Sequence, residues 1–274
     1  MNDSLAKLTK NEIETCILPF IPRNKRGFSS RFNLSDIFRC IVQKLKTGVQ
    51  WHLLFVDLES FKCPFSWQTV YYYYQKWSKQ GVFKSMFETF LEIQKDKLDT
   101  EKLNLDGTHT LVKKSAESSK YQFRKKGKTT NVLIMTDGNG IPIAIGDILK
   151  GNHNDLYRIV PQFSKMIHDL RRSDIYVNNS ILNADKGFDS KQFRRAILRR
   201  KITPNIKENT RNRKKIKRGK KRSFNPKIYQ NRFVIERSFA WIDGFRTLLI
   251  RFDKLDTSWL SWHYLAFVLI LIKV

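Results

Sequence analysis

The segment from Tyr229 to Leu249, YQNRFVIERSFAWIDGFRTLL, limits the fold of this chain because its apolar and polar residues recur at helical spacing. It has no proline, and its single glycine comes late. One side of a 3.6-residue helix would carry Val234, Ile235, Trp241, Ile242, Phe245, Leu248 and Leu249. The opposite side would carry Tyr229, Arg232, Glu236 and Asp243. The pattern predicts a helix that buries one face and presents a phenol, a guanidinium and carboxylates on the other.

Two interpretations of this polar face stay open when the segment is considered alone. It is either a surface helix with an Arg232–Glu236 pair, which contributes roughly a few tenths of a kcal/mol, or part of a functional site. The rest of the sequence has to decide between them.

The charge of the chain indicates a polyanionic partner. Lys and Arg number 52 against 25 Asp and Glu, which gives a formal net charge of +27 in a chain that is 41% hydrophobic and 13% aromatic. Solubility requires a net charge of only about 2–8 in a small domain. The excess therefore favours nucleic acid. An anionic membrane surface is the alternative, but no basic amphipathic anchor stands out.

The cysteines and the apolar segments indicate an intracellular, soluble protein. Cys16, Cys40 and Cys63 are odd in number and form no CxxC motif, which argues against a disulfide scaffold and a zinc site. The polar N-terminus does not have the pattern of a signal peptide. The apolar run from Tyr264 to Ile272 is shorter than the ~20 residues of a membrane span, so we expect a buried terminal helix and no membrane partner.

Apolar residues recur at helical spacing in residues 1–98. This pattern predicts a small all-helical, helix-turn-helix-like domain that binds DNA. Asn33 or Ser35 would cap a helix that ends at the left-handed residue Gly48. The expected helices are 4–18, the segment that ends at Gly48, the segment from 67 to about 80, and 82–98. The tyrosines at 71–74 are expected to lie partly in the core and partly at its rim.

Residues 99–274 change to strands that alternate with helices, which predicts an α/β domain with a mixed sheet. The expected strands are 102–108, 131–137, 141–149, 180–184 and 201–206, with helices at 155–170 and 188–200. A basic loop at 207–227 contains Arg213, Lys214 and Lys215, and nine of the twelve positions from 211 to 222 are Lys or Arg. Such a block is either a solvated loop or the basic rim of a nucleic-acid groove.

Two aspartates lie where predicted strands stop and glycine-containing turns begin. Asp106 follows LNL and Asp185 follows ILNA. Ligand groups collect at such strand ends in open α/β sheets, although an Asp followed by a turn glycine is also ordinary turn chemistry. With Glu236 they form three carboxylates in a very basic chain, which would repel one another unless a cation were present. Hard oxygen ligands suit Mg²⁺ or Mn²⁺, and two ions ~4 Å apart suit phosphodiester chemistry.

Several motifs stand in the order found in one family. They are RCIVQKLKTGVQWHLL at 39–54, SWQTVYYYYQKW at 66–77, LDGTH at 105–109, GKTT at 127–130, GNHNDL at 151–156, NADKGFDS at 183–190 and R-x-x-x-E-R-x-F-A-W at 232–241. Over nearly its whole length the chain resembles an insertion-sequence transposase of the IS5 group, within the IS4-like DDE transposase superfamily.

The resemblance implies an RNase H-like catalytic fold in which Asp106, Asp185 and Glu236 bind two metal ions and catalyse the reaction. It also implies that Tyr229 and Arg232 hold transposon-end DNA. Where relatives have a lysine seven residues after the glutamate, this chain has Asp243, so either Arg237 or Arg246 is expected to contact the phosphate instead, or the contact is absent. Lys186, beside Asp185, either neutralises a phosphate or is a solvated turn lysine.

The function expected from these features is that of a DNA transposase, which binds insertion-sequence ends and catalyses metal-dependent strand cleavage and strand transfer. The alternatives are an RNase H-like nuclease with the same acids and a catalytically inactive DNA-binding relative. The resemblance further implies double-stranded end and target DNA as partners, a homodimer in the DNA complex, and a cytoplasmic, nucleoid-associated location. His109 is expected to be a structural or DNA-contacting residue, and His153 and Asp155 are held as supporting residues of the site.

Overall fold

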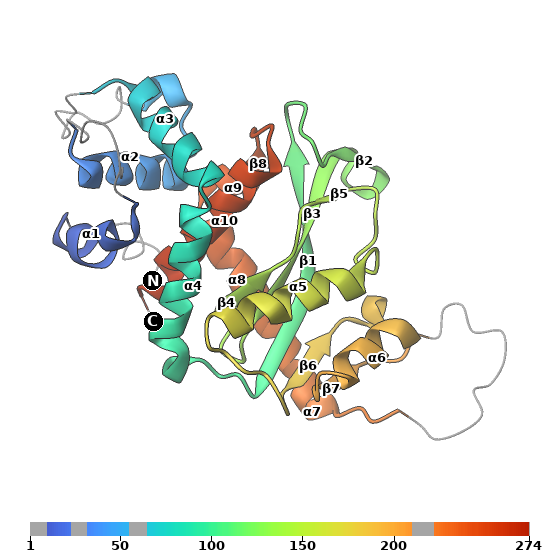
Figure 1. The fold of residues 1–274 in the computed structure, drawn as a ribbon. Coiled ribbons are helices and arrows are strands. Elements are labelled where there is room, and N and C mark those ends of the chain that lie inside the picture. Colours follow the sequence, from blue (N-terminus) through green and yellow to red (C-terminus); the bar gives the residue numbers. More distant parts are fainter. Residues whose placement is uncertain (1–9, 23–31, 55–64, 210–221, 274) are drawn as a thin grey trace. The chain divides into compact units, whose positions relative to one another are not determined.

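The computed structural model describes residues 10–22, 32–54, 65–209 and 222–273 (Figure 1). The chain packs into two compact units. Unit 1 comprises residues 1–90, 110–117 and 241–274, and unit 2 comprises residues 91–109 and 118–240. These units do not follow the boundary at residue 98 that the sequence suggests, because the C-terminal segment packs with the N-terminal helices. The division into residues 1–98 and 99–274 stays a prediction about function.

Unit 1 is helical. Its longer helices are α1 (Lys10–Cys16), α2 (Leu34–Thr47), α3 (Trp67–Lys79), α4 (Val82–Gln94) and α10 (Asp256–Leu271), and its short elements are η2 (Leu18–Phe20), η3 (Trp51–Leu53), α9 (Arg246–Leu249) and β8 (Ile250–Arg251). The predicted caps of α2 are confirmed. The Asn33 side chain accepts a hydrogen bond from the Ser35 amide at 2.9 Å, and Gly48 closes the helix with a φ of 68°.

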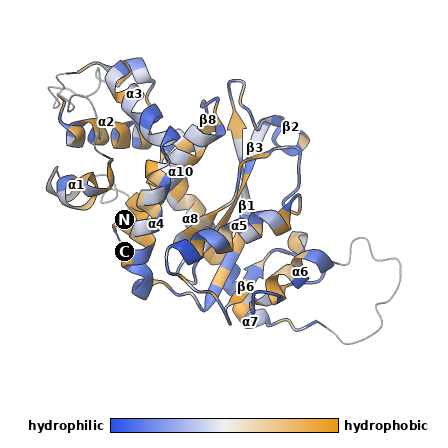
Figure 2. Cartoon of the chain, viewed as in Figure 1, coloured by the Kyte–Doolittle hydropathy of each residue, from blue (hydrophilic) through white to orange (hydrophobic). Residues whose placement is uncertain are grey.

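Helix α10 forms the centre of unit 1. It is apolar on all sides, and such a helix has to be surrounded by protein. Nearly all of its residues from Ser258 to Leu271 are buried, as expected for the terminal apolar run. The ring of Trp262 stacks on Tyr74 of α3 at 4.0 Å between centroids. Tyr74 is fully buried whereas Tyr72 is 58% exposed, so the tyrosine run is divided between core and rim as predicted. The apolar residues of α4 and α10 are orange in Figure 2.

Unit 2 is built on a mixed sheet with the strand order β2-β3-β1-β6-β7. The strands are β1 (Lys102–Val112), β2 (Lys120–Gln122), β3 (Gly127–Thr136), β4 (Pro142–Ile145), β5 (Leu149–Lys150), β6 (Ile181–Ala184) and β7 (Thr203–Ile206). Strands β1, β6 and β7 are parallel, whereas β2, β4 and β5 each pair antiparallel with β3. The chain turns from β3 to β4 through Gly138-Asn139-Gly140, as the sequence predicts.

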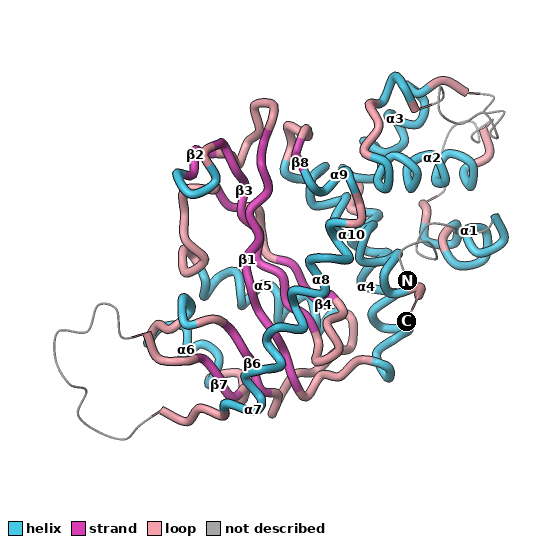
Figure 3. The backbone as a smooth tube through the Cα atoms, turned by 180° about the vertical axis from the view of Figure 1, so that it is seen from behind, coloured by secondary structure: helices cyan, strands magenta, loops and turns pink. Residues whose placement is uncertain are grey.

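Helices cover both faces of this sheet. Helices α5 (Ile159–Arg172) and α6 (Lys191–Leu198) lie on one face, and α7 (Pro226–Tyr229), η7 (Gln230–Phe233) and α8 (Val234–Asp243) lie on the other, as the opposite views of Figures 1 and 3 show. Three further short turns are η4 (Lys95–Lys97), η5 (Phe123–Lys125) and η6 (Lys186–Phe188). The architecture confirms the expected RNase H-like α/β class with a helical N-terminal region.

Two of the differences from the sequence prediction concern the segments that carry Glu236 and Asp106. The single helix expected from Tyr229 to Leu249 is divided into α7, η7, α8 and α9. It breaks at Gly244 and Phe245, where Phe245 adopts an extended φ and ψ of −93° and 94°, and helical spacing alone does not reveal such a break. Strand β1 continues to Val112, so Asp106 lies inside this strand and does not end it. In unit 1, the end of β1 gains a partner because Leu111 and Val112 pair with β8.

Within the residues that the structure describes, no helix is both long and apolar enough to cross a membrane.

Candidate active site

Asp106 and Asp185 occupy matching positions at two neighbouring parallel strands of unit 2. Leu105 of β1 is in register with Ala184, the last residue of β6, so Asp106 lies within β1 and Asp185 directly follows β6 at the equivalent position. Because side chains alternate between the faces of a sheet, equivalent positions on paired strands project to the same face. The parallel register therefore brings together the two acids that the sequence singled out.

A third carboxylate lies beside this pair. Asp155 Oδ1 accepts a hydrogen bond from Asn131 Nδ2 of β3 at 2.7 Å. A Cβ atom placed on Gly107 would collide with this oxygen and would lie 3.3 Å from Asn131 Oδ1. Asp155 therefore packs against β1 where Gly107 has no side chain. The sequence indicated Asp155 only as a supporting residue, because nothing in the spacing places residue 155 next to residue 107.

The environment of Asp106 disfavours its charged form. Burial raises the pKa of Asp106 to about 6, with further upward contributions from Asp155 and Asp185. The Gly107 amide, which donates to Asp106 Oδ1 at 2.8 Å, and the Arg232 guanidinium act in the opposite direction. Burial is the largest cause of the raised pKa, and repulsion between carboxylates that share a site adds to it. A divalent cation with oxygen ligands would relieve that repulsion, so these donors fit the hard metal ion that the sequence predicts.

Tyr229 and Arg232 lie at the two aspartates, as the polar face of their segment predicts. The Tyr229 hydroxyl hydrogen-bonds to Asp185, and burial raises the pKa of this phenol while Arg232 lowers it. The Arg232 guanidinium lies 5.2 Å from the Tyr229 ring centroid and 4.2 Å from that of Phe233. The buried Arg232 Nε atom has no hydrogen-bond partner. The site thus combines carboxylates with an arginine that has one nitrogen without a hydrogen-bond acceptor.

Glu236 is not among the charged residues that shift the pKa of Asp106. It lies in the first turn of α8, four residues after Arg232, and is exposed to solvent. The carboxylates that raise the pKa of Asp106 are Asp155 and Asp185. Across residues 10–22, 32–54, 65–209 and 222–273, no three or more His, Cys, Asp or Glu side chains are grouped so as to hold a metal ion. The assignment of Asp106, Asp185 and Glu236 as a metal-binding triad therefore stays a prediction.

The other predicted DNA-contacting residues are dispersed. Lys186 is an exposed residue of η6, and Arg237 is exposed and donates to the Asn139 carbonyl. Arg246 belongs to α9 in unit 1, where its Cβ atom packs against Gly48. Asp243, the residue of unexpected charge, is exposed at the end of α8. Arg213, Lys214 and Lys215 lie outside the described residues.

His109 and His153 take different places. Burial lowers the pKa of His109, and the charge of Asp155 opposes this shift. The side-chain amide nitrogen of Gln122 lies 3.3 Å from the Nδ1 atom of His109. The His153 ring stacks on Tyr157 at 3.7 Å. The charge of Asp155 therefore acts on His109, whereas the contact of His153 is with an aromatic ring.

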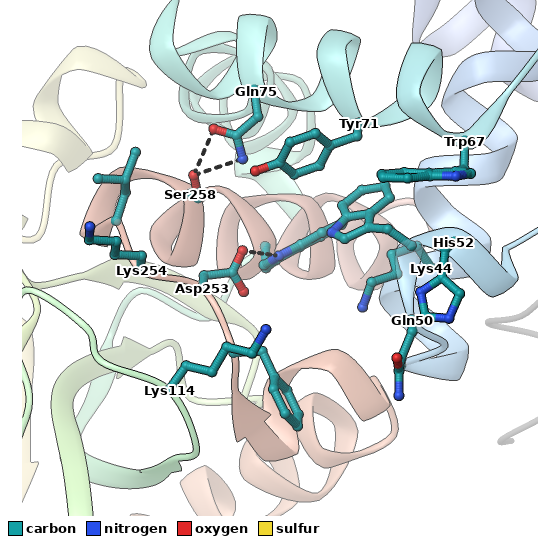
Figure 4. A pocket seen from close by; sticks show the side chains of 15 residues that line it. Lys44, Gln50, His52, Trp67, Tyr71, Gln75, Lys114, Asp253, Lys254 and Ser258 are labelled. Atoms are coloured by element: carbon teal, nitrogen blue, oxygen red, sulfur yellow. Dashed lines mark hydrogen bonds between the residues drawn. The ribbon is translucent and has the colours of Figure 1, made fainter.

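A cavity of about 700 Å³ lies within unit 1, between α2, α3 and the segment that leads into α10. Lys44, Lys114 and Asp253 point into it, and Trp67 and Tyr71 form part of its wall (Figure 4). Burial lowers the pKa of Lys44 and raises that of Asp253, although the two charges partly compensate each other. The sequence did not indicate this cavity because its lining comes from segments that are far apart in the chain.

Comparison with known proteins places these features in a family. Residues 97–271 match the family model described as a transposase DDE domain, and residues 12–87 match a putative transposase of the IS4/5 family. The chain is 33% identical over 124 residues to a putative transposase for the insertion sequence element IS402 of Burkholderia cepacia, a match that covers 44% of this chain. The aligned region spans only about half of that relative, 52% of its length.

Solved structures of the Mos1 transposase are also similar. The Mos1 strand transfer complex matches with a TM-score of 0.34 and 12% identity over 90% of this chain and 78% of the other. The Mos1 mariner paired-end complex with Mn matches with a TM-score of 0.30 and 12% identity over 93% and 82% of the two chains.

Proposed function

This chain belongs to the transposase DDE domain family, and we propose that it is a DNA transposase that cleaves DNA at insertion-sequence ends and joins them to target DNA. The observation that carries the proposal is the parallel register of β1 and β6, which sets Asp106 beside Asp185, with Tyr229 and Arg232 against them. Carboxylates beside a phenol and a guanidinium suit a phosphodiester whose charge is partly neutralised by metal.

The proposed roles follow from these positions. Asp106 and Asp185 would hold the metal, with Glu236 as the third proposed carboxylate. Divalent ions, Mg²⁺ or Mn²⁺ and two in number, would supply activation of a water or 3′-hydroxyl and stabilisation of the leaving oxygen. Arg232 would donate to a DNA phosphate through its guanidinium. Tyr229 would orient Asp185 through its hydroxyl.

We propose that further contacts to DNA come from the basic residues outside this group. Lys186, Arg237 and Arg246 would contact phosphates, and so would the loop residues Arg213, Lys214 and Lys215. Residues 1–98 would bind the transposon end. Two ends would require a homodimer in the DNA complex. Such a protein would act in the cytoplasm, where the nucleoid DNA lies.

The decisive experiment mixes the protein with Mg²⁺, a target plasmid and a DNA duplex. The duplex carries the inverted repeats that flank the coding sequence of this protein. Cleaved ends and joined products are expected, and both should disappear with a chelator or in Asp185→Asn. Cleavage without joined product would instead favour the RNase H-like nuclease. Binding of the duplex without either reaction would favour the inactive DNA-binding relative.

The same assay tests the third carboxylate. Glu236→Gln should abolish cleavage while leaving binding of the duplex unchanged, because removal of a metal ligand acts on the reaction and not on the phosphate contacts. Thr136→Val, a buried substitution of similar volume in β3, serves as the control for indirect effects. Unchanged cleavage by Glu236→Gln would remove this residue from the proposed site.

A further inference from the structure

Four asparagine side chains of unit 2 and the backbone of a fifth asparagine form a continuous chain of hydrogen bonds, which we call the asparagine ladder: the side chains of Asn231, Asn104, Asn183 and Asn205, and the backbone of Asn225. Its middle crosses the three parallel strands, because Asn104 of β1, Asn183 of β6 and Asn205 of β7 are in register. Asn183 Nδ2 donates to Asn104 Oδ1 at 3.1 Å, and Asn205 Nδ2 donates to Asn183 Oδ1 at 2.9 Å.

The asparagine ladder lies next to the two aspartates, two residues earlier along the strands. Asn104 precedes Asp106 by two residues, and Asn183 precedes Asp185 by two, so each pair projects from the same face of the sheet. Asn104 and Asn183 are fully buried and Asn205 is 3% exposed. Buried amides are unfavourable unless they are hydrogen-bonded, and apolar residues would pack the sheet without this requirement. A chain of amides at these positions calls for a reason other than burial.

Both ends of the ladder hold the segment that carries Tyr229 and Arg232. At one end, the Asn225 amide donates to Asn205 Oδ1 at 2.8 Å, and Asn205 Nδ2 donates back to the Asn225 carbonyl at 3.1 Å. Asn225 also caps α7 by accepting from the amides of Lys227 and Ile228. This end therefore fixes where the helix with Tyr229 begins.

At the other end, Asn231 lies in η7, between Tyr229 and Arg232 in the sequence. Its Oδ1 atom accepts from Asn104 Nδ2 at 3.2 Å, and its Nδ2 atom donates to the Gly138 carbonyl at 3.3 Å. Asn104 Nδ2 also donates to the Asp137 carbonyl at 3.1 Å. One ladder thus attaches the segment to the sheet on both sides of Tyr229.

We propose that the asparagine ladder is a positioning device that sets Tyr229 and Arg232 against Asp106 and Asp185. The ladder residues touch no substrate and act through the segment from 225 to 232. The inference rests on the proposed function for its catalytic consequence, but the positioning itself is a property of the DNA-free protein. Reactions of this kind are sensitive to placement, since a misplacement of about 1 Å can lower a rate about 10²-fold.

The test uses the full chain with Asn231→Ala, which detaches η7 from β1 without opening a cavity within the sheet. Hydrogen exchange of the amides from 227 to 236 should rise about tenfold or more, while exchange in β6 and β7 stays as in the wild type. Ser173→Ala is the matched control, because this buried serine of the same unit donates to the Asp169 carbonyl of α5 and not to the ladder. Unchanged exchange from 227 to 236, or an equal rise in the control, would overturn the proposal.

The catalytic consequence is measured separately on the end-bearing duplex with Mg²⁺. Asn231→Ala should lower single-turnover cleavage by about 10²-fold while the dissociation constant of the duplex changes little. A loss of binding in proportion to cleavage would refute a positioning role. If the wild-type chain neither cleaves nor joins DNA, the proposed function fails, and the hydrogen-exchange result still decides whether the ladder positions the segment.

Discussion

His263 makes the stability of unit 1 dependent on pH. It lies in the middle of α10 and is 1% exposed. Its Nδ1 atom donates to the Trp259 carbonyl at 3.0 Å, and its ring contacts the rings of Trp259 and Phe267. Burial lowers the pKa of His263 from 6.5 to about 4, and Arg251 contributes in the same direction. The folded protein therefore holds this imidazole in its neutral form.

The sign and the size of the effect follow from proton linkage. The unfolded chain binds the proton at a higher pH than the folded protein, so the stabilisation is complete above pH 6.5 and is lost as the pH falls toward 4. At 1.36 kcal/mol for each pKa unit, a fall from pH 6.5 to about 4.5 should lower the free energy of unfolding by about 3 kcal/mol. Carboxylates elsewhere add their own pH dependence, so the His263 contribution has to be isolated by substitution.

The measurement is urea unfolding of the wild type and of His263→Phe between about pH 7.5 and pH 4.5. The variant keeps an aromatic ring but cannot be protonated, so its free energy of unfolding should fall by about 3 kcal/mol less than that of the wild type. His168→Gln, in which an exposed histidine is replaced, should retain the wild-type dependence. Parallel pH curves for the wild type and His263→Phe would refute the reasoning.

Three further predictions concern residues that the structure singles out. Arg251→Met should lower the free energy of unfolding by about 3–5 kcal/mol in urea titrations, because this buried guanidinium donates to the carbonyls of Asp253 and Lys254 and to the Asp256 carboxylate; a loss below about 1 kcal/mol would contradict it. Gly107→Ala should displace Asp155 from β1 and destabilise the chain by about 1–3 kcal/mol, so a thermal melting curve that matches the wild type would argue against this close approach. Arg232→Ala should weaken binding of end-bearing DNA and reduce the slope of log affinity against log salt by about 1, whereas an unchanged slope would exclude a phosphate contact.

Some residues of the candidate site can be predicted from the local sequence, and others cannot. The sequence singled out four of these residues by local patterns. Asp106 and Asp185 each follow a run of apolar strand residues, and Tyr229 and Arg232 recur at helical spacing. Asp155 was underrated and the ladder was missed, since their partners are distant in the chain: Asn131 is 24 residues from Asp155, and Asn231 is 127 residues from Asn104. The motifs LNLDG and ILNAD contain both ladder asparagines, and an asparagine two residues before each acid was the available signal.

The sequence by itself determined the class of the fold, the caps of α2, the buried terminal helix and the family to which the chain belongs. These depend on side-chain periodicity, on turn residues and on short motifs, which act over a few residues. Only the tertiary structure decided that the segment from Tyr229 breaks before Leu249, that β1 runs on to Val112 and pairs with β8, and that the C-terminal helix joins the N-terminal helices. Each of these depends on partners brought together by strand register and core packing, and the energies of such contacts leave no trace in the local pattern of either partner.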